Sequence, residues 1–572
     1  MKTSAGLAML GAPSLFAGTK PGALSSEHQA LVKARRCRIV MQHDVFWVLL
    51  NYLKMHPEGD VPFAPFRDAV FSYADEPGSQ IDAIWWDIGG NAVGSVYPGK
   101  VFQPEVHPQV KRWHGEGVDW VRELVNETRR RRLEVFWNHR ISEVDILPEG
   151  GHAKRPCPLK VAHPDWVLPV SWWPHGMWNL AAEGLRIHKV EVLREIAARF
   201  DLDGMQIDFA RHVPCLPVGR QWELRGHVTE FMRMVRRMTQ EVAQQRGRPF
   251  LLAARVPQTL GGCRADGLDV QAWAEQHLVD ILTLGTRTMD VDVEGLRVAV
   301  GPDVRLQPCF DDHHATDGYR YASSEFLRGV FANHFQRGAD SVVTFNWAMA
   351  TPEVAKRFGG EIAPLTHQAA FREVGDPRTL VGKDKIFAVE RRGGYPWADG
   401  FFNRNDTAPL PLKLHGGESP ARLTVHLSDA PPVDPAQASL TLRCVLFQAK
   451  ETDAFEIRFN NTLLSVATRD AAWKDPQIFS PKVQPASGGK GEYKVNPKQH
   501  LLLLDCPVPL PAWKLGVNEV AIRLASRAPS PDSAVQLEKV EAHLIYGVKA
   551  EGSDFLQRKV TFNTKGDHDE QR

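Results

Sequence analysis

The chain has 572 residues, of which 43% are hydrophobic and 24% are charged. This composition is typical of a globular protein with several domains and a large core, and it excludes a mostly disordered chain. Lysine and arginine number 69 against 68 aspartate and glutamate residues, a net charge of +1, so no overall positive field favours nucleic acid or acidic lipid as a partner.

The first 18 residues form a short, weakly apolar stretch that ends in small residues and is too short to span a bilayer. This stretch resembles the second half of a bacterial twin-arginine export signal without its arginine pair. We therefore expect residues 1–30 to be an export-signal remnant with a linker, and the protein to be periplasmic or extracellular; a cytoplasmic location is the alternative. No other segment predicts a membrane span.

From about residue 36, short apolar runs alternate with amphipathic stretches, which predicts a (β/α)8 TIM barrel over residues 31–375. A doubly wound open sheet is the alternative, but no glycine-rich phosphate loop follows the first strand. Helices are expected over 118–131, 188–200, 223–245, 270–277 and 323–337. The expected strands are Arg38–Met41, Ala83–Trp86, Glu134–Trp137, Gly204–Ile207, Phe250–Ala254, Ile281–Leu284, Arg305–Pro308 and Ser341–Phe345.

After about residue 375 the hydrophobic period changes to two, with loops rich in Pro, Gly, Asp and Lys between the runs. This pattern predicts an antiparallel β-sandwich over residues 416–550. Residues 376–415 are expected to be a β-rich connector, and 551–572 a flexible tail.

The seven cysteines are scattered, odd in number and without a CxxC pair. This spacing argues against a zinc ribbon and against a disulfide framework, so we expect buried, free thiols.

Polar side chains follow every predicted barrel strand, where TIM barrels carry their functional sites. So many polar groups are costly to bury unless a polar ligand uses them, which favours a site for a polyhydroxylated molecule. The residues predicted to bind substrate are His43, Asp44, Asp87, Asn138, His139, Arg140, Arg211, His212, Arg255, Asp312, Asn346 and Trp347.

Asp208 and Asp311 are the candidate catalytic pair, because hydrolysis of a glycosidic bond needs two facing carboxyl groups. Asp208 ends the predicted fourth strand, and nearby Arg211 would hold it ionised. A salt bridge at the rim is the alternative role for Asp208. Asp311 follows the seventh strand, and since strand alternation lets only one of Asp311 and Asp312 point inward, we choose Asp311.

Histidines at several strand ends also raise the question of a catalytic metal. Amidohydrolase-type barrels begin with His-x-His on the first strand, whereas this chain has Gln42-His43-Asp44. We therefore predict no metal and no cofactor. Arg140, Arg255 and Arg287 are candidates either for an anionic group on the substrate or for internal salt bridges.

Three segments together resemble the bacterial glycosyl-hydrolase-like family 10 type of barrel. These are AHPDW at 162–166 with residues 178–212, the stretch 251–282, and 326–347, which ends in Phe-Asn-Trp. In that family the fourth strand ends in an Asp-Gly-(apolar)-x-(apolar)-Asp motif, which Asp203, Gly204 and Asp208 match. The resemblance implies the barrel fold over roughly residues 36–375 and a carbohydrate substrate.

The chain departs from this family near the seventh strand, where a glutamate is frequent and this sequence has CFDDHH. The shorter Asp311 side chain leaves retaining and inverting chemistry both open. The β-sandwich is similar to accessory domains of such barrels, and FNNTLL at 459–464 resembles their Asn-Gly hairpin with Asn461 in place of glycine.

We therefore expect a glycoside hydrolase that acts on a poly- or oligosaccharide, with acidic glycans among the candidate substrates. Two other classes stay open: a carbohydrate-binding protein on an inactive barrel, and a polysaccharide lyase that uses histidine and arginine. The absence of an acid after the fifth and sixth strands favours the inactive barrel. The sequence carries no signal for oligomeric state.

Overall fold

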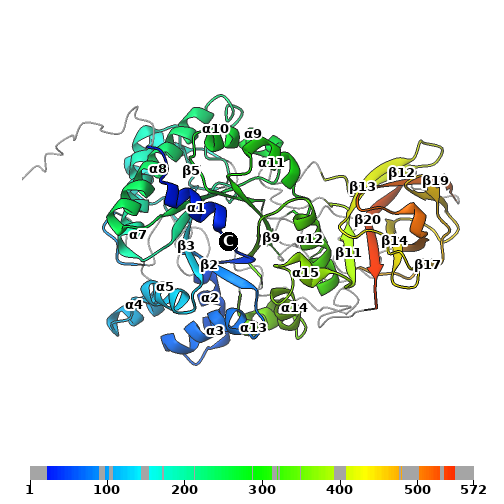
Figure 1. Cartoon of the computed structure of the whole chain (residues 1–572), viewed down its shortest axis with the longest axis horizontal. Coiled ribbons are helices and arrows are strands. Elements are labelled where there is room, and N and C mark those ends of the chain that lie inside the picture. The colour runs from blue at the N-terminus through cyan, green and yellow to red at the C-terminus, as the bar shows by residue number, and fades with distance from the viewer. Residues whose placement is uncertain are drawn as a thin grey trace, which may run out of the picture.

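The computed structural model describes residues 22–88, 97–101, 107–142, 154–170, 173–211, 213–285, 288–311, 318–319, 322–347, 350–391, 408–475, 478, 501–527 and 534–547. In Figure 1 a barrel surrounded by helices lies beside a smaller body of antiparallel strands. Residues 1–21, on which the export expectation depends, and the predicted tail 551–572 lie outside the described residues.

The larger body is a closed parallel barrel with the strand order β1-β10-β9-β8-β7-β6-β3-β2. β1 and β10, the first and last strands, pair in parallel and close it. The predicted TIM barrel is therefore confirmed, and each predicted strand overlaps an observed one. The strands are β1 (Ile39–His43), β2 (Ile81–Asp87), β3 (Glu134–Arg140), β6 (Gly204–Asp208), β7 (Leu251–Val256), β8 (Ile281–Leu284), β9 (Arg305–Asp311) and β10 (Val342–Phe345).

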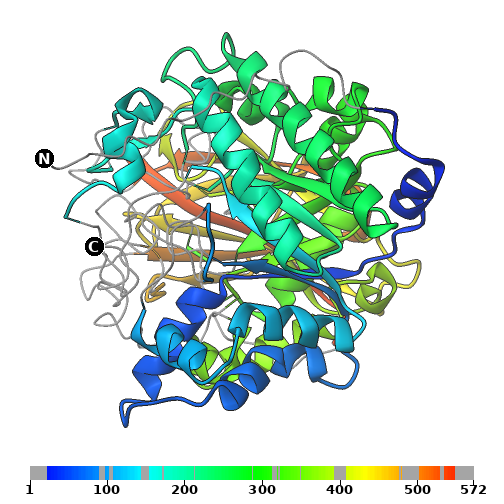
Figure 2. The ribbon, with the colours of Figure 1, turned by 90° about the vertical axis from the view of Figure 1, so that its left-hand side faces the viewer.

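Helices surround the barrel, and Figure 2 shows them on its outer side with the sandwich strands behind. The five predicted helices correspond to α5, α7, α8, α10 and α12. The helices are α1 (Ser26–Ala34), α2 (Val45–Met55), α3 (Phe63–Asp75), α4 (Pro108–Gly115), α5 (Trp120–Arg130), α6 (Pro158–Ala162), α7 (Glu183–Arg199), α8 (Arg225–Arg246), α9 (Leu260–Asp266), α10 (Val270–Glu275), α11 (Val293–Val300), α12 (Ser324–Gln336), α13 (Pro352–Gly359), α14 (Ala363–Phe371) and α15 (Pro377–Leu380).

Alternation along each strand divides the barrel side chains into two layers. Outward residues such as Ile84, Trp86 and Trp137 join the large core between strands and helices. Inward residues such as Trp85 and Phe136 stack in the lower barrel, with ring centroids 4.4 Å apart and planes nearly parallel. The lower barrel is thus a packed core, which leaves the upper strand ends for a site.

Helix α1 covers the lower end of the barrel. Val32 joins the inner core, and the His28 ring lies 2.9 Å from the Asp280 carboxylate. The expected boundary at residue 30 falls inside this helix, because these contacts make residues 26–30 part of the barrel instead of a linker.

The smaller body is an antiparallel β-sandwich, as predicted. One sheet has the order β11-β20-β14-β18-β17, with β12 also paired to β20, and the other has the order β13-β19-β15-β16. Its strands are β11 (Lys385–Ala388), β12 (Leu412–His415), β13 (Ala421–Leu427), β14 (Ser439–Phe447), β15 (Ala454–Phe459), β16 (Thr462–Leu463), β17 (Thr468–Asp470), β18 (Leu501–Val508), β19 (Gly516–Ser526) and β20 (Ala534–Ile545).

Two strands of the expected connector, residues 376–415, belong to the sandwich. Both β11 and β12 pair antiparallel with β20. They do so because β20, at 12 residues, is long enough to pair with both along one edge. The Asn-Asn hairpin is also present, since Asn460 and Asn461 both have positive φ between β15 and β16.

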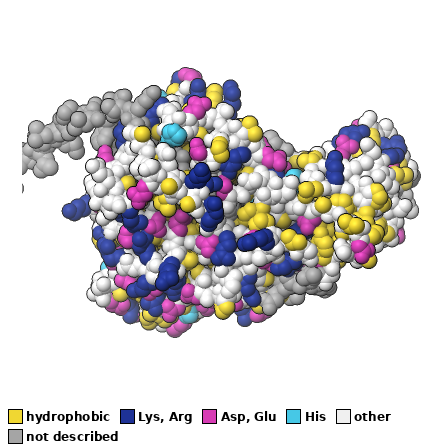
Figure 3. All heavy atoms as spheres, in the orientation of Figure 1, with side chains coloured by type: hydrophobic (Ala, Val, Ile, Leu, Met, Phe, Trp, Pro, Cys, Tyr) yellow, Lys and Arg dark blue, Asp and Glu magenta, His cyan; other side chains and the backbone are white. Residues whose placement is uncertain are grey.

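All seven cysteines are buried, and none of them forms a disulfide bond with another. None of the described helices combines the length and the hydropathy needed to cross a lipid bilayer. Figure 3 shows basic and acidic side chains intermixed over the visible face of the barrel, in agreement with the net charge of +1.

The barrel and the sandwich meet where α12 packs against β11, and Gly329 makes this close approach possible. A Cβ at Gly329 would overlap the carbonyl oxygen of Ile386, a backbone atom that cannot rotate away. We expect Gly329→Ala to lower the free energy of unfolding by about 1–3 kcal/mol, measured by urea denaturation. Gly226→Ala is the control, because a Cβ there meets only open space and should change stability by less than about 1 kcal/mol. Equal midpoints for the two variants would contradict this interpretation.

Candidate functional site

The upper end of the barrel brings together charged side chains from four strand ends. Asp87, Arg140, Asp208 and Arg255 each occupy an inward position at the carboxyl end of β2, β3, β6 or β7, and Asp44 follows β1. Arg140 pairs in register with Asp208, and Asp208 with Arg255. All five side chains are buried. These residues were all predicted to belong to the site.

Arg140 joins two of the carboxylates. Its Nη2 atom donates to Asp44 Oδ2 at 2.6 Å and to Asp87 Oδ2 at 2.7 Å, and its Nε also donates to Asp87 Oδ2 at 3.0 Å. Burial alone would lower the pKa of Arg140, but Asp44 and Asp87 outweigh that effect and raise it. The guanidinium is therefore a permanent positive charge between two aspartates.

Asp87 is the carboxyl group of this site with a raised pKa. Burial raises the pKa to about 6, and the nearby charges of Asp44 and Asp208 act in the same direction, while Arg140 opposes them. A carboxyl with a pKa near 6 can hold a proton close to neutral pH and release it during a reaction.

Asp208 is held by the backbone that follows its strand. Its Oδ1 atom accepts hydrogen bonds from the N–H groups of Ala210 at 3.1 Å and Arg211 at 3.0 Å. Its Oδ2 atom has no hydrogen-bond partner among the described residues and lies 3.5 Å from Arg255 Nη1. One oxygen thus fixes the side chain, and the other is available to a reacting atom.

The positive charge beside Asp208 Oδ2 comes from Arg255. The sequence predicted this role for Arg211, whose backbone N–H donates to Asp208 Oδ1. Arg255 is completely buried, donates from Nε to the carbonyl of Gly285 at 3.1 Å, and lies over the Phe345 ring at 4.5 Å. Arg255 takes this position because β7 is hydrogen-bonded to β6, and their register places Arg255 directly beside Asp208.

A layer of buried amides and hydroxyls supports the charged residues from below. Gln206 Nε2 donates to Asn138 Oδ1 at 2.6 Å and to Gln42 Oε1 at 3.1 Å, and Gln206 Oε1 accepts from Thr283 at 2.5 Å. Gln307 Nε2 extends the chain to Thr283 Oγ1 at 2.8 Å. Sequence reasoning predicted only Asn138 of this layer. The other residues of the layer could have been found from a polar residue two positions before a strand end, as Gln206 stands two positions before Asp208.

Asp311 lies on the opposite part of the barrel wall. It ends β9, pairs in register with Phe345, and is completely buried. Cys309, two residues earlier on the same face, accepts a hydrogen bond from Arg255 at 3.1 Å. Alternation therefore places Asp311 inward, toward the level of Arg255. Asp312 and His212 of the predicted site, and Arg287, lie outside the described residues.

Two of the predicted substrate-binding residues belong to the core between strands and helices. Trp347 donates from Nε1 to the Phe310 carbonyl and packs on His367 and Phe371, so its ring is not presented to a sugar. His139 follows Asn138 on the outward face, where burial and the nearby Lys189 charge hold the pKa of its ring well below the usual value. Strand alternation explains the His139 correction, because His139 and Arg140 cannot both point inward. Trp347 lies beyond the end of β10 and follows Asn346, which has a positive φ, so alternation along the strand no longer sets its direction.

His43 and Asn346 line a small cavity together with Asp44 and Trp347. His43 has the parity of Ile39 and Met41 on β1, which face the core between strands and helices, so it too points outward and not into the barrel. The His43 ring is 5.1 Å from Trp86, and burial lowers the pKa of His43 to about 3. Neither ring nitrogen has a hydrogen-bond partner among the described residues. His43 is thus a neutral residue of the cavity wall and does not act as a charged acid.

No group of three or more His, Cys, Asp or Glu side chains arranged like metal ligands occurs among the described residues. Fold and site together define a (β/α)8 barrel with an appended β-sandwich and a cluster of buried carboxylates and guanidiniums at the carboxyl ends of its strands.

No known family model matches the sequence, and no curated protein matches it. The resemblance to family 10-type barrels is therefore not confirmed and stays a resemblance.

Solved structures do resemble the chain. They include an alpha-L-fucosidase isoenzyme 2 from Paenibacillus thiaminolyticus, with 11% identity and a TM-score of 0.37 over 62% of this chain and 52% of that one. The glycoside hydrolase domain of PgaB (BpsB) from Bordetella bronchiseptica has 10% identity and a TM-score of 0.37 over 60% of this chain and 99% of that one. An Anoxybacillus alpha-amylase has 12% identity and a TM-score of 0.35 over 86% and 99%.

The match spans about half the length of the fucosidase. Likeness at this distance carries no activity or substrate over to this chain. The proposal below therefore depends on the side chains of the barrel itself.

Proposed function

We propose that the protein is a glycoside hydrolase that cleaves a poly- or oligosaccharide at the upper end of its barrel. The observation that carries the proposal is the environment of Asp208. Its Oδ1 is fixed by two backbone N–H groups, while its Oδ2 lies beside the buried charge of Arg255 and has no hydrogen-bond partner among the described residues. Such a carboxylate suits attack at an anomeric carbon or on a water molecule.

Asp311 is the proposed partner that donates a proton to the leaving oxygen, because it lies inward on the opposite wall. In the reaction, the bond between the anomeric carbon and the leaving oxygen breaks, and that oxygen takes the proton. Asp208 either bonds to the anomeric carbon, and water then releases the sugar, or directs water to it in one step. The anomer of the first product distinguishes these two courses.

A second assignment of the proton donor is supported by one observation, the raised pKa of Asp87. With a pKa of about 6, Asp87 is protonated below that value and can act as the acid. If Asp87 is the donor, kcat should fall as the pH rises through about 6, and Asp87→Asn should remove this limb of the profile. If Asp311 is the donor, Asp311→Asn should instead cause the larger loss of kcat, and Asp87→Asn should leave the shape of the profile unchanged. The measurement is kcat from pH 4 to 9 for the three proteins.

The substrate that best suits the described residues is neutral. Arg140 is already paired with Asp44 and Asp87, and Arg255 with Asp208, so both guanidiniums have partners within the protein. Hydroxyl groups of a sugar can bind to these charged groups without displacing them. A neutral glycan is therefore proposed over the acidic one that the sequence also allowed.

The function is tested by a screen of the purified full chain against a broad panel of polysaccharides, with reducing ends and ultraviolet absorbance read together. New reducing ends, absent with Asp208→Asn, support the hydrolase. Products with a new absorbing double bond would identify the polysaccharide lyase instead. Binding without either product would identify the inactive, carbohydrate-binding barrel.

A further inference from the structure

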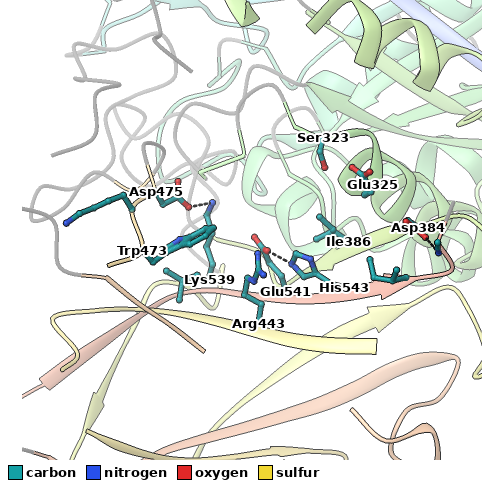
Figure 4. Close-up of a pocket in the computed structure, with 14 residues that line it drawn as sticks. Ser323, Glu325, Asp384, Ile386, Arg443, Trp473, Asp475, Lys539, Glu541 and His543 are labelled. Carbon is teal, nitrogen blue, oxygen red and sulfur yellow. Dashed lines mark hydrogen bonds and ion pairs between the residues drawn. The ribbon is translucent and has the colours of Figure 1, made fainter. Parts of the chain in front are cut away.

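A second cavity, separate from the barrel site, lies between the sandwich and the barrel. It measures about 270 Å³ and is lined by β11, β14, β20, the segment after β17 and the beginning of α12. Figure 4 shows β20 below the cavity, Ser323 and Glu325 of the barrel above it, and Trp473 at one side. The cavity therefore exists only where the two bodies meet.

The alternation of β20 makes the floor of this cavity polar. Lys539, Glu541 and His543 line it, whereas Val540 and Ala542 between them point into the sandwich core. Buried polar groups are costly unless hydrogen bonds or opposite charges satisfy them. The polar floor is therefore suited to a ligand that forms hydrogen bonds.

The charges of the floor are balanced within the protein. Glu541 contacts His543 at 2.8 Å and accepts from the Tyr319 hydroxyl at 3.0 Å; burial would raise its pKa, but His543, Lys539 and Arg443 lower it to about 2. Lys539 pairs with Asp475 at 2.8 Å. Arg443 pairs with Asp505 at 2.8 Å. A ligand for this floor would therefore carry hydroxyl groups and no strong charge of its own.

Two groups of the cavity have hydrogen-bonding capacity that none of the described residues uses. Glu325 is only 9% exposed, and no hydrogen bond or ion pair joins its carboxylate to another described residue. The Trp473 Nε1 atom is buried without a hydrogen-bond partner among the described residues. The first is an acceptor on the barrel side, and the second is a donor on the sandwich side.

Trp473 also supplies an aromatic surface. Its ring packs partly on the small apolar cluster of Val445, Ile478 and Leu501, and the Arg443 guanidinium lies 5.5 Å from its centroid. An indole held in this way can stack on the C–H face of a sugar ring while the polar floor receives the hydroxyls.

We propose that this cavity binds a neutral sugar residue of a glycan, with Trp473 as the stacking surface and Glu325 as a hydroxyl acceptor. The inference rests on the proposed function for the identity of the ligand, which is the glycan that the barrel cleaves. Because the ligand would contact both bodies, the cavity would hold the chain of the glycan at the junction while the barrel acts on another part of it.

The test measures binding to the full chain carrying Asp208→Asn, so that no ligand is cleaved. The probes are neutral malto-, cello-, laminari- and manno-oligosaccharides at up to 10 mM, followed by calorimetry and by saturation-transfer NMR. We expect at least one series to bind, Trp473→Ala to weaken it at least tenfold, and Glu325→Gln to weaken it several-fold. Trp222→Ala is the control, because Trp222 is a half-buried indole between Arg225 and Arg264 that lines neither of the two cavities described above.

Binding by none of the four series would overturn the proposal, and so would equal affinities for Trp473→Ala, Glu325→Gln and Trp222→Ala. Unfolding of Trp473→Ala would not remove the test, since Glu325→Gln keeps the size of the side chain. Failure here differs from failure of the proposed hydrolase, because binding is measured without turnover. Turnover of a short substrate by Trp473→Ala in the active chain then shows whether the barrel works independently of this cavity.

Discussion

Replacement of Asp208 by asparagine is expected to lower kcat on the identified substrate by about 10³-fold or more. The substitution removes the charge on Oδ2, the oxygen that lies 3.5 Å from Arg255 and is proposed to react. The fold should persist, because the asparagine Oδ1 can still accept the hydrogen bonds of Ala210 and Arg211. The measurement is steady-state kinetics together with the midpoint of urea denaturation.

Asp82→Asn is the matched control for this experiment. Asp82 lies near the opposite end of the barrel, on β2, where it forms a surface ion pair with Arg38 at 2.8 Å. Its loss should leave kcat within about twofold, because surface ion pairs contribute little to stability and this one is far from the site. An Asp208→Asn variant that keeps more than a tenth of the wild-type kcat would contradict the assigned role.

The second large effect is expected at Asp266, a buried carboxyl outside the proposed site. Asp266 ends α9 and is 3% exposed, and neither carboxylate oxygen has a hydrogen-bond partner among the described residues. Burial raises its pKa to about 7. The folded state therefore binds this proton more tightly than the unfolded state does. The stability that the proton contributes is fully present below the unfolded pKa and is lost as the pH rises through about 7.

We therefore expect the change in the free energy of unfolding caused by Asp266→Asn to be more stabilising at pH 8 than at pH 5. The difference in the effect between the two pH values should be about 2–3 kcal/mol, since each pKa unit between pH 5 and the native pKa corresponds to about 1.4 kcal/mol. The asparagine stays neutral at both pH values, so the cost of ionising a buried carboxyl disappears. Urea denaturation of both proteins at both pH values measures it.

Asp280 provides a matched control with the opposite sign. It is equally buried, but it pairs with Arg236 at 2.9 Å and with His28 at 2.9 Å. Burial alone would raise its pKa, yet Arg236 and His28 lower it to about 2. Asp280→Asn should therefore destabilise the protein at pH 8, because it leaves the Arg236 charge buried without its carboxylate. A stability change at Asp266 that does not depend on pH would rule out the buried-acid interpretation.

Local pattern was sufficient to predict much of the architecture. The eight barrel strands, five of the helices and the sandwich follow from hydrophobic period alone, because each element must turn its apolar side chains toward one core. Strand alternation could also have excluded His139 from the predicted substrate-binding residues, because it is adjacent to the inward-pointing Arg140 on the same strand. The two strands of residues 376–415 escaped this reasoning, because β11 and β12 are short and only their pairing with β20 shows where they belong.

The sequence by itself therefore determined which residues end the barrel strands, and so the set of polar groups at its upper end. It did not determine which of these groups contact one another. Arg140 binds Asp44 and Asp87 across 96 and 53 residues of chain, and the guanidinium beside Asp208 Oδ2 belongs to Arg255 and not to Arg211. Those partners depend on strand register and on closure of the barrel, which arise from packing among all eight strands at once. The same holds for the cavity at Trp473 and Glu325, which forms only after the two bodies come together.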